Sequence, residues 1–219
     1  MLADIESAVS DTFAEASSVV GYDLWRLVAE GPEAQLNQTE FTQPAMLTSS
    51  IAMYRLARDR GVPSPNVVAG HSLGEYSALV AAKVLEFSDA VELVQQRGRF
   101  MQSAVPIGEG SMAAVMGLSD DNVRAACEAS TERGIVQAAN YNAPGQVVIA
   151  GSSAAVERAI EACKAAGARR AILLPVSAPF HSMLMQSAAE KMAVVLESVN
   201  FSAAEVPVVQ NVDAAAHQD

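Results

Sequence analysis

The chain has 219 residues, of which 51% are apolar, 5% aromatic and 18% charged. This length suits one large α/β domain, or one domain with a smaller one inserted, and it supplies enough apolar surface for a core without disulfides or a structural metal. The formal net charge of −11 argues against a nucleic-acid partner, because a phosphate backbone repels an acidic chain.

The two cysteines, Cys127 and Cys163, lie in alanine-rich helical patterns with no further Cys or His at metal-ligand spacing. We interpret them as buried thiols of a reducing compartment and predict no metal site. No apolar run reaches the roughly 18 residues of a membrane span, and the N-terminus has no signal-peptide pattern. We therefore expect a cytoplasmic protein with no membrane partner.

The first part of the chain predicts helices around one short strand. Apolar residues at helical spacing indicate a helix over residues 2–17, followed by a polar loop through Asn37. Pro44 suits the first position of the next helix, where its missing N–H is not needed, and Gly61 suits its C-terminal cap. We then expect a short strand over 67–69 and a helix over 75–83. A further helix is expected over 88–104, where Ser88 and Asp89 can cap its start.

The segment 108–177 predicts a compact inserted subdomain. Its elements follow the order βαββαβ, which is typical of a ferredoxin-like unit. They are expected over 112–117, 119–130, 135–140, 146–150, 152–166 and 170–176. A helix over about 182–199 and a buried strand over 206–210 follow. We therefore predict an α/β protein whose main domain, residues 1–107 with 178–219, has a parallel sheet.

Ser72 is the candidate nucleophile. It occupies the centre of a Gly-x-Ser-x-Gly pattern, Gly70 to Gly74, between an apolar strand and an amphipathic helix, where a nucleophile elbow is built. The two glycines allow a sharp turn that exposes the serine hydroxyl, and the N–H of Leu73 is placed to stabilise an oxyanion.

His181 is the candidate base. His71 adjoins the nucleophile and diverges from it, and His217 lies in a polar tail that looks frayed. His181 stands at a loop-to-helix junction, where active-site groups commonly lie. No acid between Ser72 and His181 can be singled out, so either the acid is unrecognised or a neutral carbonyl orients the histidine. Arg97 or Arg99 would bind a carboxylate if placed beside the serine, whereas two solvated helix arginines are the simpler interpretation.

These motifs together resemble the bacterial malonyl-CoA:acyl-carrier-protein transacylases. The stretches that carry the resemblance span nearly the whole chain in the family's order: 42–45, 70–79, 97–102, 140–146, 179–182 and 206–212. The resemblance implies an α/β-hydrolase-like domain with a ferredoxin-like insertion. It also implies fatty acid biosynthesis as the setting, malonyl-CoA as substrate, acyl carrier protein as partner and no cofactor beyond the partner's phosphopantetheine.

The resemblance assigns roles to particular residues. Ser72 would form a malonyl ester with His181 as base, a carbonyl oxygen from a later segment would orient the histidine, and Arg97 would pair with the malonyl carboxylate. Gln43 and Asn142 lie in motifs that line the family's cleft, and Phe180 suits a malonyl-selective pocket. We expect a monomer.

The chain departs from the family at both ends. Neither the N-terminal strand with its Gln-containing oxyanion loop nor the segments beyond residue 219 have a match, so we expect a truncated enzyme that is slow or inactive. A serine hydrolase or thioesterase is one alternative function, and an inactive fragment that binds the carrier protein is another.

Overall fold

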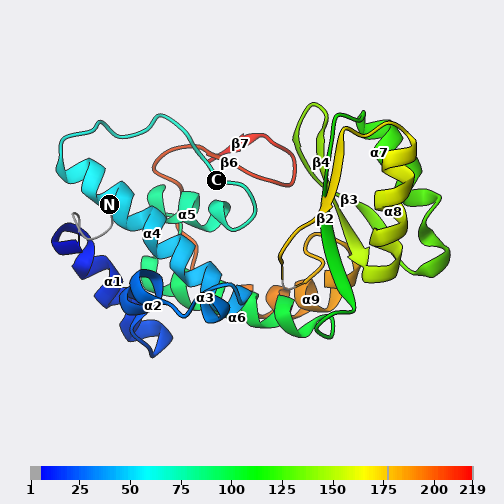
Figure 1. Ribbon diagram of the computed structural model, residues 1–219. Coiled ribbons are helices and arrows are strands. Elements are labelled where there is room, and N and C mark those ends of the chain that lie inside the picture. Colours follow the sequence, from blue (N-terminus) through cyan, green and yellow to red (C-terminus); the bar gives the residue numbers. More distant parts are fainter. Residues whose placement is uncertain (1–5, 177, 219) are drawn as a thin grey trace. The chain divides into compact units, whose positions relative to one another are not determined.

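The computed structural model describes residues 6–176 and 178–218 (Figure 1). The chain divides into two compact units, residues 1–99 with 194–219 and residues 100–193. The predicted domain boundaries at 107 and 178 stay a prediction. The elements of the first unit are α1 (Glu6–Val20), α2 (Leu24–Glu30), α3 (Glu33–Leu36), α4 (Thr39–Asp59), β1 (Val68–Ala69), α5 (Gly74–Ala81), the larger part of α6 (Phe87–Ser103), β6 (Val208–Val209) and β7 (Ala216–His217).

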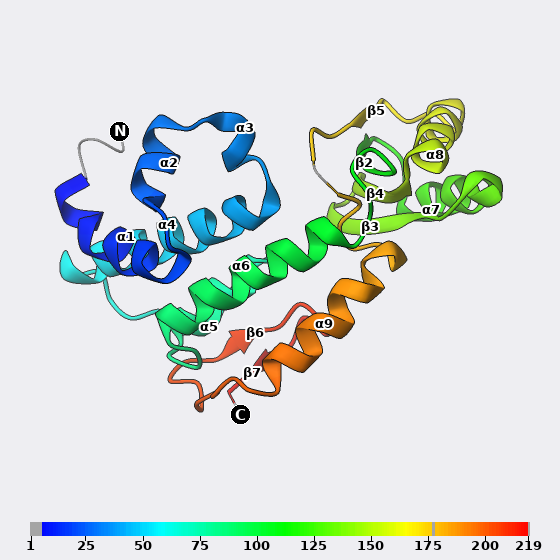
Figure 2. The same ribbon diagram turned by 90° about the horizontal axis from the view of Figure 1, so that it is seen from below.

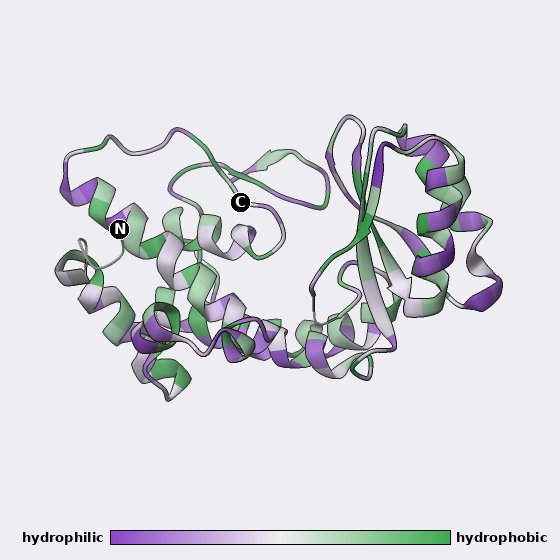
Figure 3. Ribbon diagram, viewed as in Figure 1, coloured by the Kyte–Doolittle hydropathy of each residue, from purple (hydrophilic) through white to green (hydrophobic). Residues whose placement is uncertain are grey.

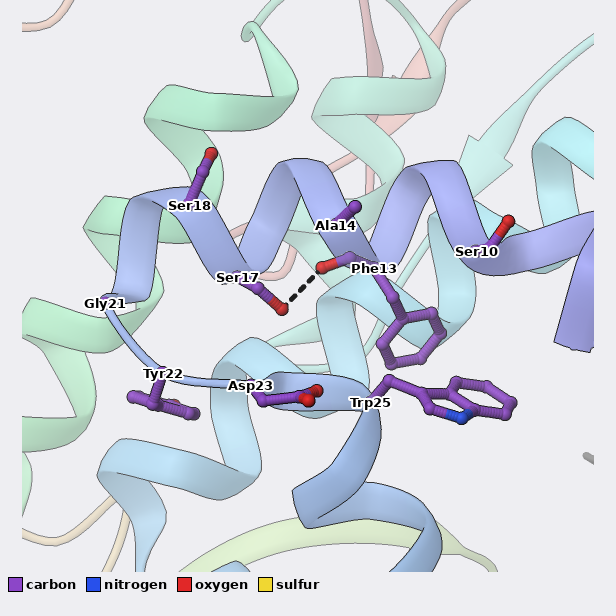
Figure 4. A pocket seen from close by; sticks show the side chains of 9 residues that line it. All are labelled: Ser10, Phe13, Ala14, Ser17, Ser18, Gly21, Tyr22, Asp23 and Trp25. Carbon is purple, nitrogen blue, oxygen red and sulfur yellow. Dashed lines mark hydrogen bonds between the residues drawn. The ribbon is translucent and has the colours of Figure 1, made fainter.

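The N-terminal helices pack through aromatic rings. Phe13 on α1 and Trp25 on α2 meet edge to face with ring centroids 5.0 Å apart (Figure 4). The Ser17 hydroxyl donates to the Phe13 carbonyl and accepts from the N–H of Leu24, which ties the end of α1 to the start of α2. The expected loop through Asn37 is wrong, because α2 and α3 occupy it. Asp23 caps α2 by accepting from the N–H of Arg26.

Helix α4 begins five residues before the expected position. Pro44 lies inside it, rather than at its first turn, although an interior proline removes one backbone hydrogen bond. Close packing against Gly98 of α6 stabilises the first turn of α4. A Cβ at Gly98 would lie 2.6 Å from Glu40 Cα and 2.7 Å from the carbonyl oxygen of Thr39. The two helices therefore approach each other at backbone distance. The cap at Gly61 is confirmed by its φ of +83°.

A three-stranded sheet in the order β1-β6-β7 supports the predicted turn after β1. Strand β1 pairs in parallel with β6, with Val68 opposite Val208. Strand β6 pairs antiparallel with β7, and the two are labelled side by side in Figure 2. The interpretation of His217 as part of a frayed tail is wrong. It lies on β7, and its Nε2 is 2.7 Å from Asp213 Oδ2.

The second unit contains the predicted ferredoxin-like sheet. Its elements, with the last helix crossing the unit boundary, are β2 (Gly110–Met116), α7 (Asp120–Glu128), the short helix Thr131–Arg133, β3 (Val136–Ala143), β4 (Gln146–Ser152), α8 (Ser153–Ala165), β5 (Arg170–Leu173), the short helix Met183–Met185 and α9 (Gln186–Leu196). The strand order is β3-β4-β2-β5 with antiparallel neighbours throughout. Seven residue pairs join β2 to β4, from Gly110 opposite Ser152 to Met116 opposite Gln146.

Helices α7 and α8 cover one face of this sheet (Figure 1). Alternate residues of β2 and β4, including Val115 and Ile149, pack against Val123 of α7 and Val156 of α8. Hydrophilic patches alternate with hydrophobic ones along α8, as its amphipathic sequence requires (Figure 3). The buried thiols of Cys127 and Cys163 belong to this core, as predicted. The fold is therefore of the predicted α/β class.

Candidate active site

The turn between β1 and α5 has the geometry of a nucleophile elbow. Strand β1 ends at Ala69, and α5 begins at Gly74. Between them Ser72 adopts a φ of +54°. The left-handed region costs a non-glycine residue about 1–2 kcal/mol, and such strain persists where the surrounding structure over-determines it. The sequence motif predicted this turn, and the backbone angle at its serine is the one that an elbow requires.

The two glycines of the motif contribute differently. A Cβ at Gly70 would overlap the carbonyl group of Gly74 and lie 2.6 Å from the N–H nitrogen of Glu75. A Cβ at Gly74 would meet no heavy atom within 4 Å. The expectation that both glycines avoid a clash is therefore met only at Gly70, where the strand end touches the first turn of α5.

We expect Gly70→Ala to lower the free energy of unfolding by about 1–3 kcal/mol, because overpacking forces the backbone to shift. The shift displaces Ser72, so acylation at this serine falls as well. Gly74→Ala is the matched control and should leave both properties close to those of the unchanged protein. Urea unfolding midpoints measure the first effect, and the rate of serine acylation measures the second. Equal behaviour of the two variants would contradict this account of the turn.

The Arg97 guanidinium lies directly against the elbow. Its Nη2 donates to Ser72 Oγ at 3.1 Å, and its Nη1 donates to Gln43 Oε1 at 2.6 Å. Gln43 is buried and donates through Nε2 to Thr39 Oγ1 at 2.9 Å. The close approach of α4 and α6 at Gly98 brings these side chains within reach. Two residues that sequence reasoning singled out, Arg97 and Gln43, are thus brought to the predicted nucleophile.

Arg99, the other arginine considered from the sequence, lies elsewhere. Its Nε donates to Glu40 Oε2 at 3.2 Å, and just over half of its side chain is exposed. Arg97 forms no ion pair with any carboxylate among the residues described. Its guanidinium carbon lies 5.9 Å from the centroid of the Tyr76 ring. Burial lowers the pKa of Arg97, while Tyr76 acts in the opposite direction. Arginine stays charged at neutral pH despite such a shift, so a half-buried positive charge faces Ser72.

Asn211 is a residue of the elbow to which sequence reasoning gave no role. It follows β6, and its Oδ1 accepts from the N–H of Ser72 at 2.7 Å. Its Nδ2 donates to the Gly70 carbonyl at 2.6 Å, and its own N–H donates to Glu75 Oε2 at 2.8 Å. Its place in the stretch 206–212, which carries part of the family resemblance, is the one hint that the sequence offers about Asn211. No local pattern could reveal the contact with Ser72, because it spans 139 residues of chain.

The other predicted site residues lie in both units: Leu73 in the first, and Asn142, Phe180 and His181 in the second. Leu73 is the N-cap of α5, so its N–H belongs to the helix end where donors lack intrahelical acceptors. In the second unit Asn142 is exposed on β3, and Phe180 packs against Met112 and its neighbours. His181 is exposed and has a φ of +60°, in a turn where the Ser182 hydroxyl donates to the Pro179 carbonyl. The expected helix after His181 begins only at Gln186, behind a short 3₁₀ turn.

In the ranges 6–176 and 178–218, no three His, Cys, Asp or Glu side chains are grouped so that they could hold a metal ion. No helix in those ranges combines the length and the apolar character needed to cross a membrane.

Known proteins that are similar to this sequence identify its family. A family model described as acyl transferase domain matches residues 5–219, and the chain belongs to this family. It is 56% identical over 216 residues to the malonyl CoA-acyl carrier protein transacylase of Escherichia coli K12. The aligned region covers 97% of this chain and 70% of that relative. The enzyme of the same name from Bacillus subtilis is 48% identical over 94% of this chain and 65% of its own length.

Solved structures lead to the same family. A malonyl-transacylase in complex with a type II polyketide synthase acyl-carrier protein matches with a TM-score of 0.97 and 52% identity, over all of this chain and 72% of that chain. An acyl carrier protein S-malonyltransferase from Vibrio cholerae matches with a TM-score of 0.93 and 51% identity, over all of this chain and 71% of that chain. The predicted family is therefore confirmed.

Proposed function

We propose that this protein transfers a malonyl group from coenzyme A to the phosphopantetheine thiol of acyl carrier protein, in fatty acid biosynthesis. Its relatives at 56% and 48% identity carry the name of this activity. The single observation that carries the proposal at the level of residues is the guanidinium of Arg97, 3.1 Å from the hydroxyl of a strained serine. A cation at this distance from a nucleophile suits an acyl group that ends in a carboxylate.

The first half of the proposed reaction forms an ester at Ser72. The Ser72 oxygen attacks the thioester carbonyl of malonyl-CoA and gives its proton to His181. The N–H of Leu73 stabilises the negative oxygen of the tetrahedral intermediate. When the intermediate collapses, the carbon–sulfur bond breaks, and the CoA sulfur leaves with the proton from His181. The malonyl-enzyme is a neutral ester at the serine, with a free carboxylate at its other end.

The second half repeats these steps with another thiol. The phosphopantetheine thiol of acyl carrier protein gives its proton to His181 and attacks the ester, and Ser72 leaves with that proton. The result is malonyl-carrier protein and free enzyme. The proposed reaction needs no metal and no cofactor bound to this chain, because the carrier protein brings the pantetheine arm. The structure with a TM-score of 0.97 is of a malonyl-transacylase with its acyl-carrier protein, which supports the choice of partner.

Selectivity for malonyl is assigned to the pair of Arg97 and Gln43. The guanidinium presents a planar fork that matches a carboxylate, and Gln43, held by Thr39, restrains one prong of that fork. An acetyl group would leave this half-buried charge without a carboxylate to pair with, and a site built to bind a charged group discriminates against an analogue that lacks it. Asn142 and Phe180 are kept as further substrate-binding residues, on the strength of the family motifs in which they stand.

A transfer assay tests this function. The protein is incubated with malonyl-CoA and holo acyl carrier protein, and the carrier is weighed intact. We expect malonyl-carrier protein to accumulate in a single turnover at the least, with free CoA released in equal amount. Acetyl-CoA is the control substrate and should give much less product. Release of free malonate without transfer would instead support the hydrolase alternative, and binding of the carrier without chemistry would support the inactive fragment.

The remaining assignments concern the state of the protein in the cell. A cytoplasmic location is supported by the two free, buried thiols, which suit a reducing compartment. We also propose that the protein acts as a monomer, with malonyl-CoA and acyl carrier protein as its only partners in the reaction. Sedimentation of the protein alone and with the carrier tests the monomer proposal.

A further inference from the structure

We infer that Asn211 is a positioning residue that holds Ser72 in its strained, reactive conformation. The inference rests on the proposed role of Ser72 as nucleophile and assigns to Asn211 a function within that site. Asn211 itself is placed in contact with the turn, not with the substrate.

The side-chain amide of Asn211 continues the pairing between β1 and β6 past the ends of both strands. The parallel ladder runs through Val68 opposite Val208 and Ala69 opposite Val209. Beyond it, Nδ2 of Asn211 donates to the Gly70 carbonyl, and Oδ1 accepts from the N–H of Ser72. One amide therefore satisfies one backbone group on each side of His71, where a regular strand partner would have supplied two separate groups.

This arrangement restrains the two peptide groups on either side of His71, immediately before the strained Ser72. Ser72 adopts a φ of +54°, and strained residues need surroundings that over-determine their geometry. Gly70 approaches α5 so closely that no side chain fits there. With the Gly70 carbonyl and the Ser72 N–H both held by one planar group, the turn cannot relax by rotating either peptide without breaking a hydrogen bond.

Asn211 is itself anchored from two directions. Its N–H donates to Glu75 Oε2, which belongs to the first turn of α5. The loop that carries it is closed by mutual hydrogen bonds between Gln210 and the pair Ala214 and Ala215. The amide thus connects the strand end, the nucleophile and the start of the helix. It fixes the position of Ser72 Oγ relative to Arg97, 3.1 Å away.

The experiment compares single-turnover malonylation of the Asn211→Ala and Asn211→Asp variants across a range of malonyl-CoA concentrations, with intact mass as the readout. For Asn211→Ala we expect the maximal rate of acylation to fall about 10- to 100-fold, while the half-saturating concentration of malonyl-CoA stays within about twofold. The reason is that the Asn211 side chain holds the turn and does not contact the substrate. Asn211→Asp keeps the acceptor for the Ser72 N–H and loses the donor to Gly70, so its rate should lie between those of the unchanged protein and Asn211→Ala.

Amide hydrogen exchange supplies a readout that does not depend on activity. In Asn211→Ala the Ser72 amide should exchange at least about tenfold faster, while the amide of Ile149, in the ferredoxin-like core, keeps its rate. Asn200→Ala, which changes another exposed asparagine of the same unit, is the control and should change neither readout.

The acylation and exchange results test the role of Asn211 separately from the proposed function. Unchanged acylation and unchanged Ser72 exchange in Asn211→Ala would overturn the inference, and so would a loss of rate that is matched by a general rise in exchange across the unit in both Asn211 variants. If the unchanged protein formed no malonyl adduct at Ser72, the proposed function would fail, and the exchange comparison would still decide whether Asn211 holds the turn.

Discussion

Replacing Ser72 by alanine is expected to abolish the malonyl adduct that the unchanged protein forms with malonyl-CoA. Removal of a serine nucleophile lowers catalysis on the order of 10⁶-fold where the reaction proceeds through a covalent intermediate. The effect is this large because no neighbouring group of the turn can form the ester. Intact-mass analysis after incubation with malonyl-CoA should show one added malonyl group per chain, which disappears in Ser72→Ala.

The control for this experiment is Ser50→Ala, which removes an exposed serine hydroxyl from α4 in the same unit. It should acylate like the unchanged protein. His181→Ala should still be acylated at Ser72, but about 10²–10⁴-fold more slowly, as expected for the loss of a general base. An adduct of full size in Ser72→Ala would place the nucleophile elsewhere and remove the basis of the proposed mechanism.

Replacing Arg97 by alanine is expected to lower malonyl transfer by about 10²–10³-fold and to erase the preference for malonyl over acetyl. The malonyl carboxylate would then enter a partly desolvated site without its cation, and truncation of one partner of a desolvated, hydrogen-bonded charge pair costs about 2–5 kcal/mol. Transfer from acetyl-CoA has no carboxylate to lose, so it should fall little or rise. The ratio of kcat/KM for malonyl-CoA to that for acetyl-CoA measures the effect.

Two further variants make this test specific to the geometry of Arg97. Arg99→Ala removes a guanidinium two residues away that is paired with Glu40, and it should leave the malonyl preference intact. Arg97→Lys keeps the charge and loses the planar fork that contacts both Ser72 and Gln43, so only a partial recovery of selectivity is expected. Loss of transfer from both acyl groups alike in Arg97→Ala would indicate that this arginine supports the serine rather than selecting the substrate.

Sequence patterns predicted most regular elements, with errors at their ends. The ferredoxin-like unit was predicted from the order of its elements, and Ser119 caps α7 as expected by accepting from the N–H of Asn122. Helix α2 was missed because its seven residues are too few for a clear period, although Asp23 is a recognisable N-cap. The start of α4 was placed too late because proline normally marks a first turn, and here packing against Gly98 outweighs that preference.

The candidate site divides in the same way between local and distant information. The sequence by itself determined the family and the position of the sharp turn that carries the predicted nucleophile, Ser72, because a strand, a tight turn and a helix are local and their residues are consecutive. The residues around Arg97 and Arg99 could not distinguish the two, since both lie on one helix with similar neighbours, and only the family resemblance pointed to Arg97. Only the approach of α4 to α6 directs Arg97 toward Ser72 and leaves Arg99 with Glu40.

The two hydrogen bonds between the Asn211 side chain and the turn were equally impossible to predict from the sequence. An asparagine after a strand has many ordinary roles in turns, and nothing in its neighbours links it to a serine 139 positions earlier. The parallel pairing of β1 with β6 creates that link. Consecutive residues thus specified the turn that presents Ser72, whereas contacts between distant segments decided which cation and which amide contact that turn, since such contacts exist only after the chain has folded.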